Sequence, residues 1–166
     1  MSNIWFCSDL HFGHNNIQRY RKEVISEEHN RTSIVLDWQS SVKKKDTVYV
    51  LGDACFTLET LPVFGNLAGK KILIRGNHDE LPAQEYLKYF DEVYGIIKYK
   101  GYWLSHAPIH PNELRGKQNI HGHVHYNSVD SPWYVNACVE NVSARYQRAL
   151  MNLDEVRRDF PKPETA

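Results

Sequence analysis

The histidines of this chain constrain its fold more than any other feature of the sequence. Eight of the nine histidines fall in or beside short clusters that also contain Asp, Asn or Gly, and only His29 stands apart. Most of these clusters directly follow a run of apolar or β-branched residues, which is the pattern of a buried strand. Functional sites of α/β sheets assemble at the ends of strands. We therefore expect an α/β fold that gathers the clusters at one edge.

The hydrophobic pattern predicts strands that alternate with helices. Strands are expected at residues 4–8, 47–51, 71–74, 93–99, 102–105, 118–120, 134–139 and 148–152. Apolar residues at helical spacing predict helices at 32–42, 81–90 and 154–160. Residues 58–67 are expected to form a short or irregular helix, because Pro62 and Gly65 interrupt an apolar stretch.

Length and composition favour one domain over residues 1–166, since the chain has 42% hydrophobic residues and no repeat or linker-like tract. Lys plus Arg and Asp plus Glu both number 20, so no basic excess would attract nucleic acid or a membrane surface. The three cysteines are an odd number, which favours free thiols in a reducing compartment. Residues 1–7 lack the pattern of a secretory leader, and we expect a cytoplasmic protein without membrane contact.

Five clusters contain the side chains that could bind metal ions. The candidate ligands are Asp9, His11, Asp53, Asn77, His106, His123 and His125. Carboxylate, amide and imidazole groups without thiolate suit hard or borderline divalent cations, with manganese preferred here over iron, nickel, zinc and cobalt. Seven ligands are too many for one tetrahedral ion, but they suit two ions about 3.5–4 Å apart that share a bridging carboxylate. Asp53 is the bridging candidate, and His123 and His125 are expected on one side of an extended segment.

The ordered series Asp9-Leu10-His11, Gly52-Asp53, Gly76-Asn77-His78-Asp79, Ser105-His106 and Gly122-His123-Val124-His125 resembles the calcineurin-like metallophosphoesterase family. The resemblance implies a four-layer αββα sandwich of two mixed sheets. It implies that Asp9, His11, Asp53 and His125 hold one metal, and that Asp53, Asn77, His106 and His123 hold the other. It also implies that a metal-activated hydroxide attacks phosphorus while His78 acts as general acid. Asp79 is expected to orient His78.

Four further residues are weaker candidates for contacts to a substrate phosphate: His14, Asn30, Arg31 and Arg75. Ordinary alternatives remain open for each of them, namely loop packing for His14, a helix cap for Asn30 and a turn contact for Arg75. His110 and His121 lie close to ligands without a role in the motif, so packing or support of the ligands would explain them. Cys55 is expected to be a small apolar residue near the site.

The resemblance is strongest to compact bacterial and phage phosphodiesterases that lack a cap domain. We therefore expect hydrolysis of small phosphodiesters or phosphomonoesters of the nucleotide type at an open site. A protein phosphatase is disfavoured, because Ala54-Cys55-Phe56-Thr57 replaces the residues that follow Gly-Asp in that branch. A nuclease acting on DNA or RNA is the second reading, and a non-catalytic scaffold of the same fold is the third.

No sequence feature indicates an oligomeric state. Tyr126 and Trp133 are the aromatic residues that could stack on a nucleobase.

Overall fold

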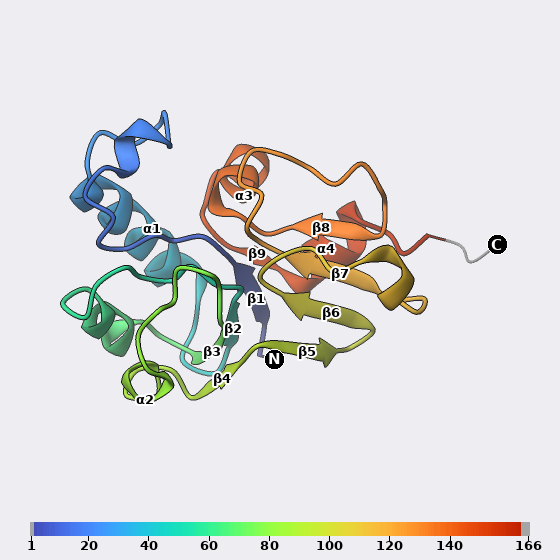
Figure 1. Cartoon of the computed structure of the whole chain (residues 1–166), viewed down its shortest axis with the longest axis horizontal. Coiled ribbons are helices and arrows are strands. Elements are labelled where there is room, and N and C mark those ends of the chain that lie inside the picture. The colour runs from blue at the N-terminus through green and yellow to red at the C-terminus, as the bar shows by residue number, and fades with distance from the viewer. Residues whose placement is uncertain (1, 164–166) are drawn as a thin grey trace.

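The computed structural model describes residues 2–163, which form two mixed β-sheets with helices around them (Figure 1). The first sheet has the strand order β4-β3-β2-β1-β9, and the second has the order β5-β6-β7-β8. The strands of the first sheet are β1 (Ile4–Cys7), β2 (Thr47–Val50), β3 (Lys70–Ile74), β4 (Glu92–Tyr94) and β9 (Met151–Asn152). Those of the second are β5 (Ile96–Tyr99), β6 (Tyr102–Ser105), β7 (Gln118–His121) and β8 (Tyr134–Asn136). This architecture confirms the predicted α/β class.

The central strands β1, β2 and β3 of the first sheet are buried on both faces along most of their length, as is usual for parallel strands. In β1, Trp5 and Cys7 point into a core beneath the helices, whereas Phe6 points into a core between the two sheets. The inter-sheet core also contains Leu104, Ile120 and Val135 of the second sheet. The two sheets therefore face each other across a continuous apolar layer, and their strand ends lie close enough to share one site.

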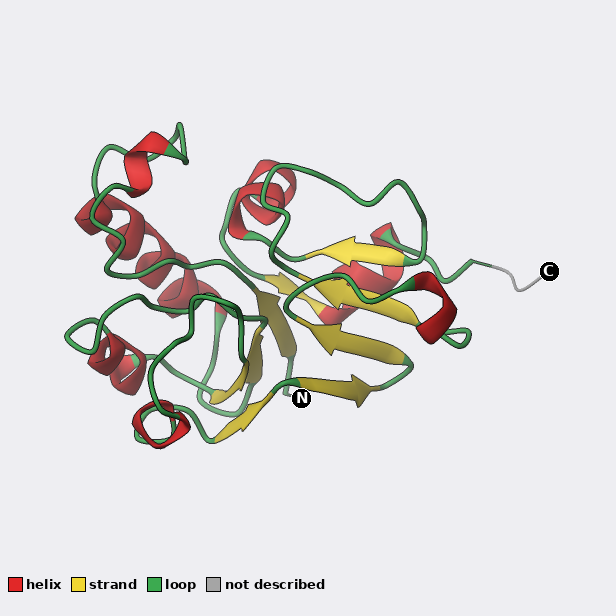
Figure 2. Cartoon of the chain, viewed as in Figure 1, coloured by secondary structure: helices red, strands yellow, loops and turns green. Residues whose placement is uncertain are grey.

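Helices cover the outer face of the first sheet, as Figure 2 shows. These are α1 (Glu27–Ser41), the 3-10 helix η2 (Leu61–Asn66) and α2 (Ala83–Tyr86), and a further 3-10 turn, η1 (Ile17–Arg19), precedes α1. The outer face of the second sheet is covered more thinly by the segment around η3 (Pro111–Glu113), where the Trp103 indole donates to the Leu114 carbonyl (3.1 Å). Helices α3 (Val139–Tyr146) and α4 (Leu153–Asp159) add Val142 and Val156 to the inter-sheet core.

One apolar run that the sequence predicts as a single strand, 93–99, is divided between the two sheets. Its first part is β4, which pairs parallel to β3, and its second part is β5, which pairs antiparallel to β6. The break falls at Gly95, around which no atom would meet an added Cβ within 4 Å. Hydrophobic alternation continues across the break, so the pattern alone cannot reveal that the chain changes sheets.

The first helix begins earlier than the apolar spacing predicts, and this changes the meaning of two candidate residues. Ser26 caps α1 by accepting a hydrogen bond from the His29 amide (3.0 Å), and two acidic residues occupy the first turn, where the helix dipole favours them. Asn30 and Arg31 therefore lie inside α1 instead of preceding it. The predicted strand 134–139 ends at residue 136, and α3, which the hydrophobic pattern did not indicate, begins at Val139.

No helix in the described range 2–163 is long and apolar enough to cross a membrane. The three cysteines are all buried and free, as the odd count predicted.

Candidate metal centre

The loops that follow five strands bring all seven candidate ligands to one end of the two sheets. The loops after β1, β2 and β3 carry the aspartates, His11 and Asn77, and those after β6 and β7 carry the other three histidines. The first group of donors surrounds Asp9. Its Oδ1 lies 3.6 Å from His11 Nε2 and 3.6 Å from His125 Nε2. These three residues form one candidate set of metal ligands.

The second group surrounds His106. Its Nε2 lies 3.5 Å from Asp53 Oδ1, 2.9 Å from Asn77 Oδ1 and 3.2 Å from His123 Nδ1. Asp53 joins the two groups, because its other oxygen, Oδ2, lies 3.6 Å from His11 Nε2. The structure thus places the two oxygens of Asp53 toward two different sets of donors, a position from which this carboxylate could bridge two ions.

The separations between these atoms, 2.9–3.6 Å, bracket those expected of ligands that share an ion, and the two shortest of them also qualify as hydrogen bonds. Two donor atoms, each about 2.1 Å from one ion, lie about 3.0–3.4 Å apart at octahedral or tetrahedral angles. Asp9 Oδ1 and both ring nitrogens of His11 are buried and have no hydrogen-bond partner among the described residues. Buried polar atoms normally have partners, so these orphaned donors indicate a missing one. The donor types also match a divalent cation, and the residues present therefore fit the group that the sequence predicts.

The backbone of these loops is strained at the ligands themselves. Five of the seven candidate ligands have positive φ angles: Asp9, His11, Asp53, His123 and His125, with values between 51° and 73°. Residues other than glycine rarely adopt this left-handed conformation, and when they do they cluster at functional sites. The finding also corrects one prediction, because His123 and His125 do not lie on an extended segment. Two left-handed residues in a turn direct their imidazoles toward the centre.

Asp9 shows how one oxygen can be held while the other stays free. Its Oδ2 accepts hydrogen bonds from the Ser8 hydroxyl (2.6 Å), the His123 amide (2.9 Å) and the Cys138 thiol (3.2 Å). Burial acts to raise the pKa of Asp9, but His11, His106 and the hydrogen bonds outweigh it and lower the pKa well below its usual range. The carboxylate is therefore ionised and fixed with Oδ1 facing the donors. Sequence reasoning missed Ser8 and Cys138, which belong to no recognised motif.

A buried charge network holds the His125 ring at Nδ1, the nitrogen that faces away from the other candidate ligands. Glu140 Oε1 lies 3.0 Å from His125 Nδ1 and also accepts from Arg21 Nη2 (2.6 Å). A carboxylate at Nδ1 selects the tautomer that keeps the Nε2 lone pair free for a metal. The hydrogen bond to Glu140 is also the largest influence that raises the pKa of His125. Arg21 continues the network to the Asp9 carbonyl (2.8 Å) and to Asn30 Oδ1 (2.6 Å). Sequence reasoning missed Arg21 and Glu140 because they lie 119 residues apart.

Asp79 does not orient His78 as predicted. Its Oδ2 accepts from the backbone amides of Asp53 (2.8 Å) and Gly76 (2.8 Å), and its Oδ1 accepts from Ala54 (2.9 Å). These bonds tie the loop after β2 to the loop after β3. Burial, the largest influence, raises the pKa of Asp79 to about 6. His78 lies instead against Phe56, with ring centroids 4.8 Å apart and planes inclined by 26°.

Two glycines are required because ligands occupy the space where a side chain would be. A Cβ on Gly122 would collide with the Ser8 hydroxyl and the Asp9 carboxylate, and a Cβ on Gly76 would collide with Asp53. Neither glycine has a positive φ. Close approach of the loops therefore explains these two positions.

The weaker substrate candidates have different outcomes. Three of the four are engaged by other groups of the chain: Asn30 is buried and donates to the Leu10 carbonyl (2.9 Å), Arg31 pairs with Glu27 (3.0 Å), and Arg75 donates to the Asp79 and Leu81 carbonyls (2.5 and 2.9 Å). The sequence could not show that intramolecular acceptors already engage these groups. His14 is different, because it lies beside the metal centre with its ring 6.1 Å from that of His11.

Three other residues near the clusters have structural explanations. His110 caps η3 by accepting from the Asn112 amide (3.2 Å), and His121 is buried beside Tyr134, where burial lowers its pKa. Cys55 is buried, and burial raises the pKa of its thiol to about 12, so it behaves as an apolar residue at neutral pH.

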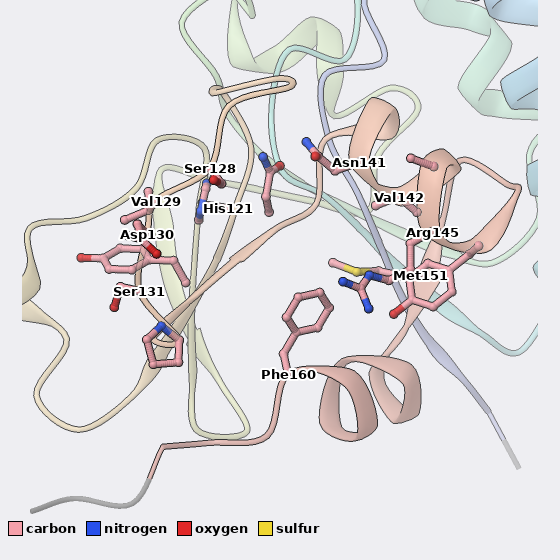
Figure 3. A pocket seen from close by; sticks show the side chains of 15 residues that line it. His121, Ser128, Val129, Asp130, Ser131, Asn141, Val142, Arg145, Met151 and Phe160 are labelled. Carbon is pink, nitrogen blue, oxygen red and sulfur yellow. The ribbon is translucent and has the colours of Figure 1, made fainter.

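Two cavities differ in their relation to these ligands. One, of about 420 Å³, opens directly onto the centre and includes His11, His78 and His125 in its walls. The other, of about 670 Å³, lies between residues 128–132, α3 and Phe160 (Figure 3). Its walls include His121 and Arg145 but none of the seven candidate ligands. The smaller cavity is therefore the one that adjoins the chemistry.

Comparisons with known proteins agree with this geometry. A family model described as calcineurin-like phosphoesterase matches residues 2–165. An uncharacterized protein of Methanocaldococcus jannaschii, MJ1445, is 34% identical over 145 residues, which is 82% of this chain and 77% of that protein. The Gene 66 protein of Mycobacterium phage L5 is 38% identical over 48% of this chain and 41% of its own length. The crystal structure of a protein of unknown function, AQ665 from Aquifex aeolicus, covers 95% of this chain and 99% of its own with a TM-score of 0.77 and 29% identity.

Proposed function

The chain belongs to the calcineurin-like phosphoesterase family, and from that premise we propose that it is a dinuclear metal-dependent hydrolase of small phosphodiesters or phosphomonoesters. Members of the family are generally hydrolases of phosphoesters. The expected substrates are nucleotide-like, and the expected metal is manganese, with iron, nickel, zinc and cobalt as alternatives.

One observation carries this proposal: buried donor atoms converge on a centre where several of them have no partner. Asp9 Oδ1 and His11 Nε2 are both orphaned, and Asp53 presents one oxygen to each half of the centre. Two adjacent divalent ions would satisfy all of these atoms at once. An arrangement of this kind suits in-line displacement at phosphorus, because both the attacking and the leaving oxygen need stabilisation.

The residues divide the work between binding and proton transfer. Asp9, His11, Asp53 and His125 would hold one ion, and Asp53, Asn77, His106 and His123 would hold the other. Bound divalent ions lower the pKa of coordinated water toward about 7 and so supply a nucleophile at neutral pH. His78 lines the adjoining cavity, and its imidazole makes no hydrogen bond to other described side chains, so it is free to donate a proton to the leaving oxygen.

The composition supports a small substrate over a polynucleotide. The formal net charge of the chain is zero, and proteins that track a nucleic-acid backbone generally present a basic stripe. A nuclease remains the alternative that the test must address.

The proposal is tested by turnover of a panel of model esters: bis-p-nitrophenyl phosphate, p-nitrophenyl phosphate, and 2′,3′- and 3′,5′-cyclic nucleotides. Each is assayed with manganese, nickel, zinc or magnesium, and Asp53→Asn serves as the control. We expect metal-dependent hydrolysis that the variant lacks. Nicking of plasmid or single-stranded DNA would favour the nuclease reading. If the protein binds metals but turns over none of the esters, the result would contradict the proposal and favour a non-catalytic scaffold.

A further inference from the structure

The cavity of about 420 Å³ beside the metal centre has a wall that the catalytic residues do not explain. Besides His11, His78, His125 and Glu140, its lining consists of His14, Ile17, Tyr20 and Phe56. We propose that these four residues form a subsite for a flat, uncharged aromatic group of the substrate, such as a nucleobase. The inference rests on the proposed function, since the subsite is defined by its position beside the phosphate.

The walls of this subsite are aromatic and apolar. Phe56 packs against His78, and the His14 ring meets Phe56 edge-on at a centroid distance of 4.8 Å. Tyr20 continues the series, with its centroid 5.5 Å from that of His14 and its plane nearly perpendicular. Ile17, which is only 3% exposed, contributes an apolar surface. Aromatic side chains arranged in this way bind flat rings by stacking and edge contacts.

Tyr20 presents the free surface of the subsite. Its side chain is 70% exposed, although most large apolar side chains of this chain are buried. The backbone beneath it is ordered by hydrogen bonds, since the Ile17 amide donates to the His14 carbonyl (3.0 Å) and the Tyr20 amide to the Ile17 carbonyl (2.9 Å). Tyr20 is therefore an exposed ring on a defined turn, at the mouth of a cavity that leads to the metal centre.

The composition of the cavity disfavours substrates with further phosphates. Among the described residues that line it there is no lysine or arginine, and Glu140 adds a carboxylate. Arg21 lies nearby but is buried, and its guanidinium is already engaged by Glu140, Asn30 and the Asp9 carbonyl. Binding sites for phosphate groups normally use cations or free backbone amides. The subsite therefore suits a neutral ring better than a further phosphate, because none of its lining side chains is a lysine or an arginine.

The volume of the cavity also fits a small organic group. Pockets for small organic ligands usually occupy about 300–1,000 Å³ and have mostly apolar and aromatic walls. At about 420 Å³ the cavity matches one nucleoside-sized group better than an extended polymer. A phosphoester held at the metals would place its organic group against this wall, because the candidate ligands His11 and His125 also line the cavity.

The test compares two ligands that carry the same phosphate and differ in the base: adenosine 5′-monophosphate and ribose 5-phosphate. Their dissociation constants are measured by calorimetry on the manganese-loaded protein, and their inhibition constants are measured against bis-p-nitrophenyl phosphate. We expect the nucleotide to bind about 10-fold more tightly, since stacking on an aromatic side chain commonly contributes that much. Tyr20→Ala should lose most of this preference, and Tyr20→Phe should keep it. Tyr94→Ala, which removes another exposed tyrosine on β4, is the matched control.

The outcomes separate the two proposals. Equal affinity for the two ligands, or a preference that survives in Tyr20→Ala, would overturn the subsite while leaving hydrolysis intact. A base preference that depends on Tyr20 in a protein that hydrolyses no ester would overturn the proposed function and retain the subsite. Because Tyr20 is exposed, its substitution leaves the core untouched, and an unchanged unfolding transition verifies this.

Discussion

Asp9 and Asp79 are both buried carboxylates at the same end of the first sheet, but their surroundings differ. Both oxygens of Asp79 accept backbone N–H groups, so this side chain is fully engaged in holding two loops together. Asp9 uses one oxygen in that way and leaves the other without a partner, opposite two imidazoles. A satisfied buried group serves the structure, whereas an unsatisfied one indicates where a ligand binds.

The largest effect should come from removing the carboxylate that joins the two halves of the donor set. Asp53→Asn should lose bound metal and lower turnover by at least about 10³-fold, because the pKa of water rises from about 7 back toward about 15.7 without the ions. Metal content by mass spectrometry and turnover of a diester measure both quantities. A variant that keeps metal and activity together would remove Asp53 from the bridging position.

His78 should affect turnover without affecting metal content. We expect His78→Ala to lower kcat by about 10²- to 10⁴-fold, the usual contribution of a general acid, while both ions remain bound. His110→Ala is the matched control, since His110 is exposed and caps a 3-10 turn away from the donors. Full activity of the His78 variant would show that another group protonates the leaving oxygen.

Asp79 should affect stability more directly than chemistry. Asp79→Ala leaves three backbone N–H groups without an acceptor, and we expect a loss of about 3 kcal/mol or more in the free energy of unfolding. Urea denaturation in the presence of a chelator measures this loss without the contribution of metal binding. Under the same conditions Asp53→Asn should have a smaller effect, because it relieves repulsion with Asp9. If Asp53→Asn lowered the free energy of unfolding more than Asp79→Ala, the contrast between supporting and metal-facing carboxylates would be wrong.

Glu140 should tune metal affinity through His125. Glu140→Gln weakens the hydrogen bond to His125 Nδ1 and removes the negative charge that pairs with the buried Arg21. Substitutions of this kind typically lower metal affinity by about 10- to 100-fold. Titration of the metal-free protein with manganese measures the effect, and Glu113→Gln, in an exposed pair with Arg115, is the control. Unchanged affinity for manganese would mean that the hydrogen bond between Glu140 and His125 does not contribute to metal binding.

The smallest effect on turnover is expected from a substitution in the cavity of about 670 Å³. Arg145→Ala should change diester turnover by no more than about twofold, as expected of a substitution away from special features. The guanidinium of Arg145 lies over the Phe160 ring at 4.9 Å and contacts none of the candidate ligands. A large loss of activity would mean that this cavity communicates with the metal centre.

The clusters predicted the donor set better than they predicted its supports. Each candidate ligand lies directly after a strand, and short-range pattern therefore located all seven of them at one end of the sheets. Arg21, Glu140, Ser8 and Cys138 were missed, because each acts on a ligand through a contact that depends on the fold. The fold also decides which polar groups are already engaged by other residues. Asn30, Arg31 and Arg75 have the right chemistry to bind phosphate, but intramolecular acceptors engage them.

The sequence by itself determined the α/β class, the strand ends that carry the donors, and the chemical type of ligand they would accept. These follow from local periodicity and side-chain chemistry, which need no knowledge of distant residues. Only the tertiary structure decided that Asp79 ties loops together, that one apolar run serves two sheets, and that five ligands adopt left-handed backbone conformations. Each of these depends on which residues from separate parts of the chain compete for the same hydrogen bonds and the same space.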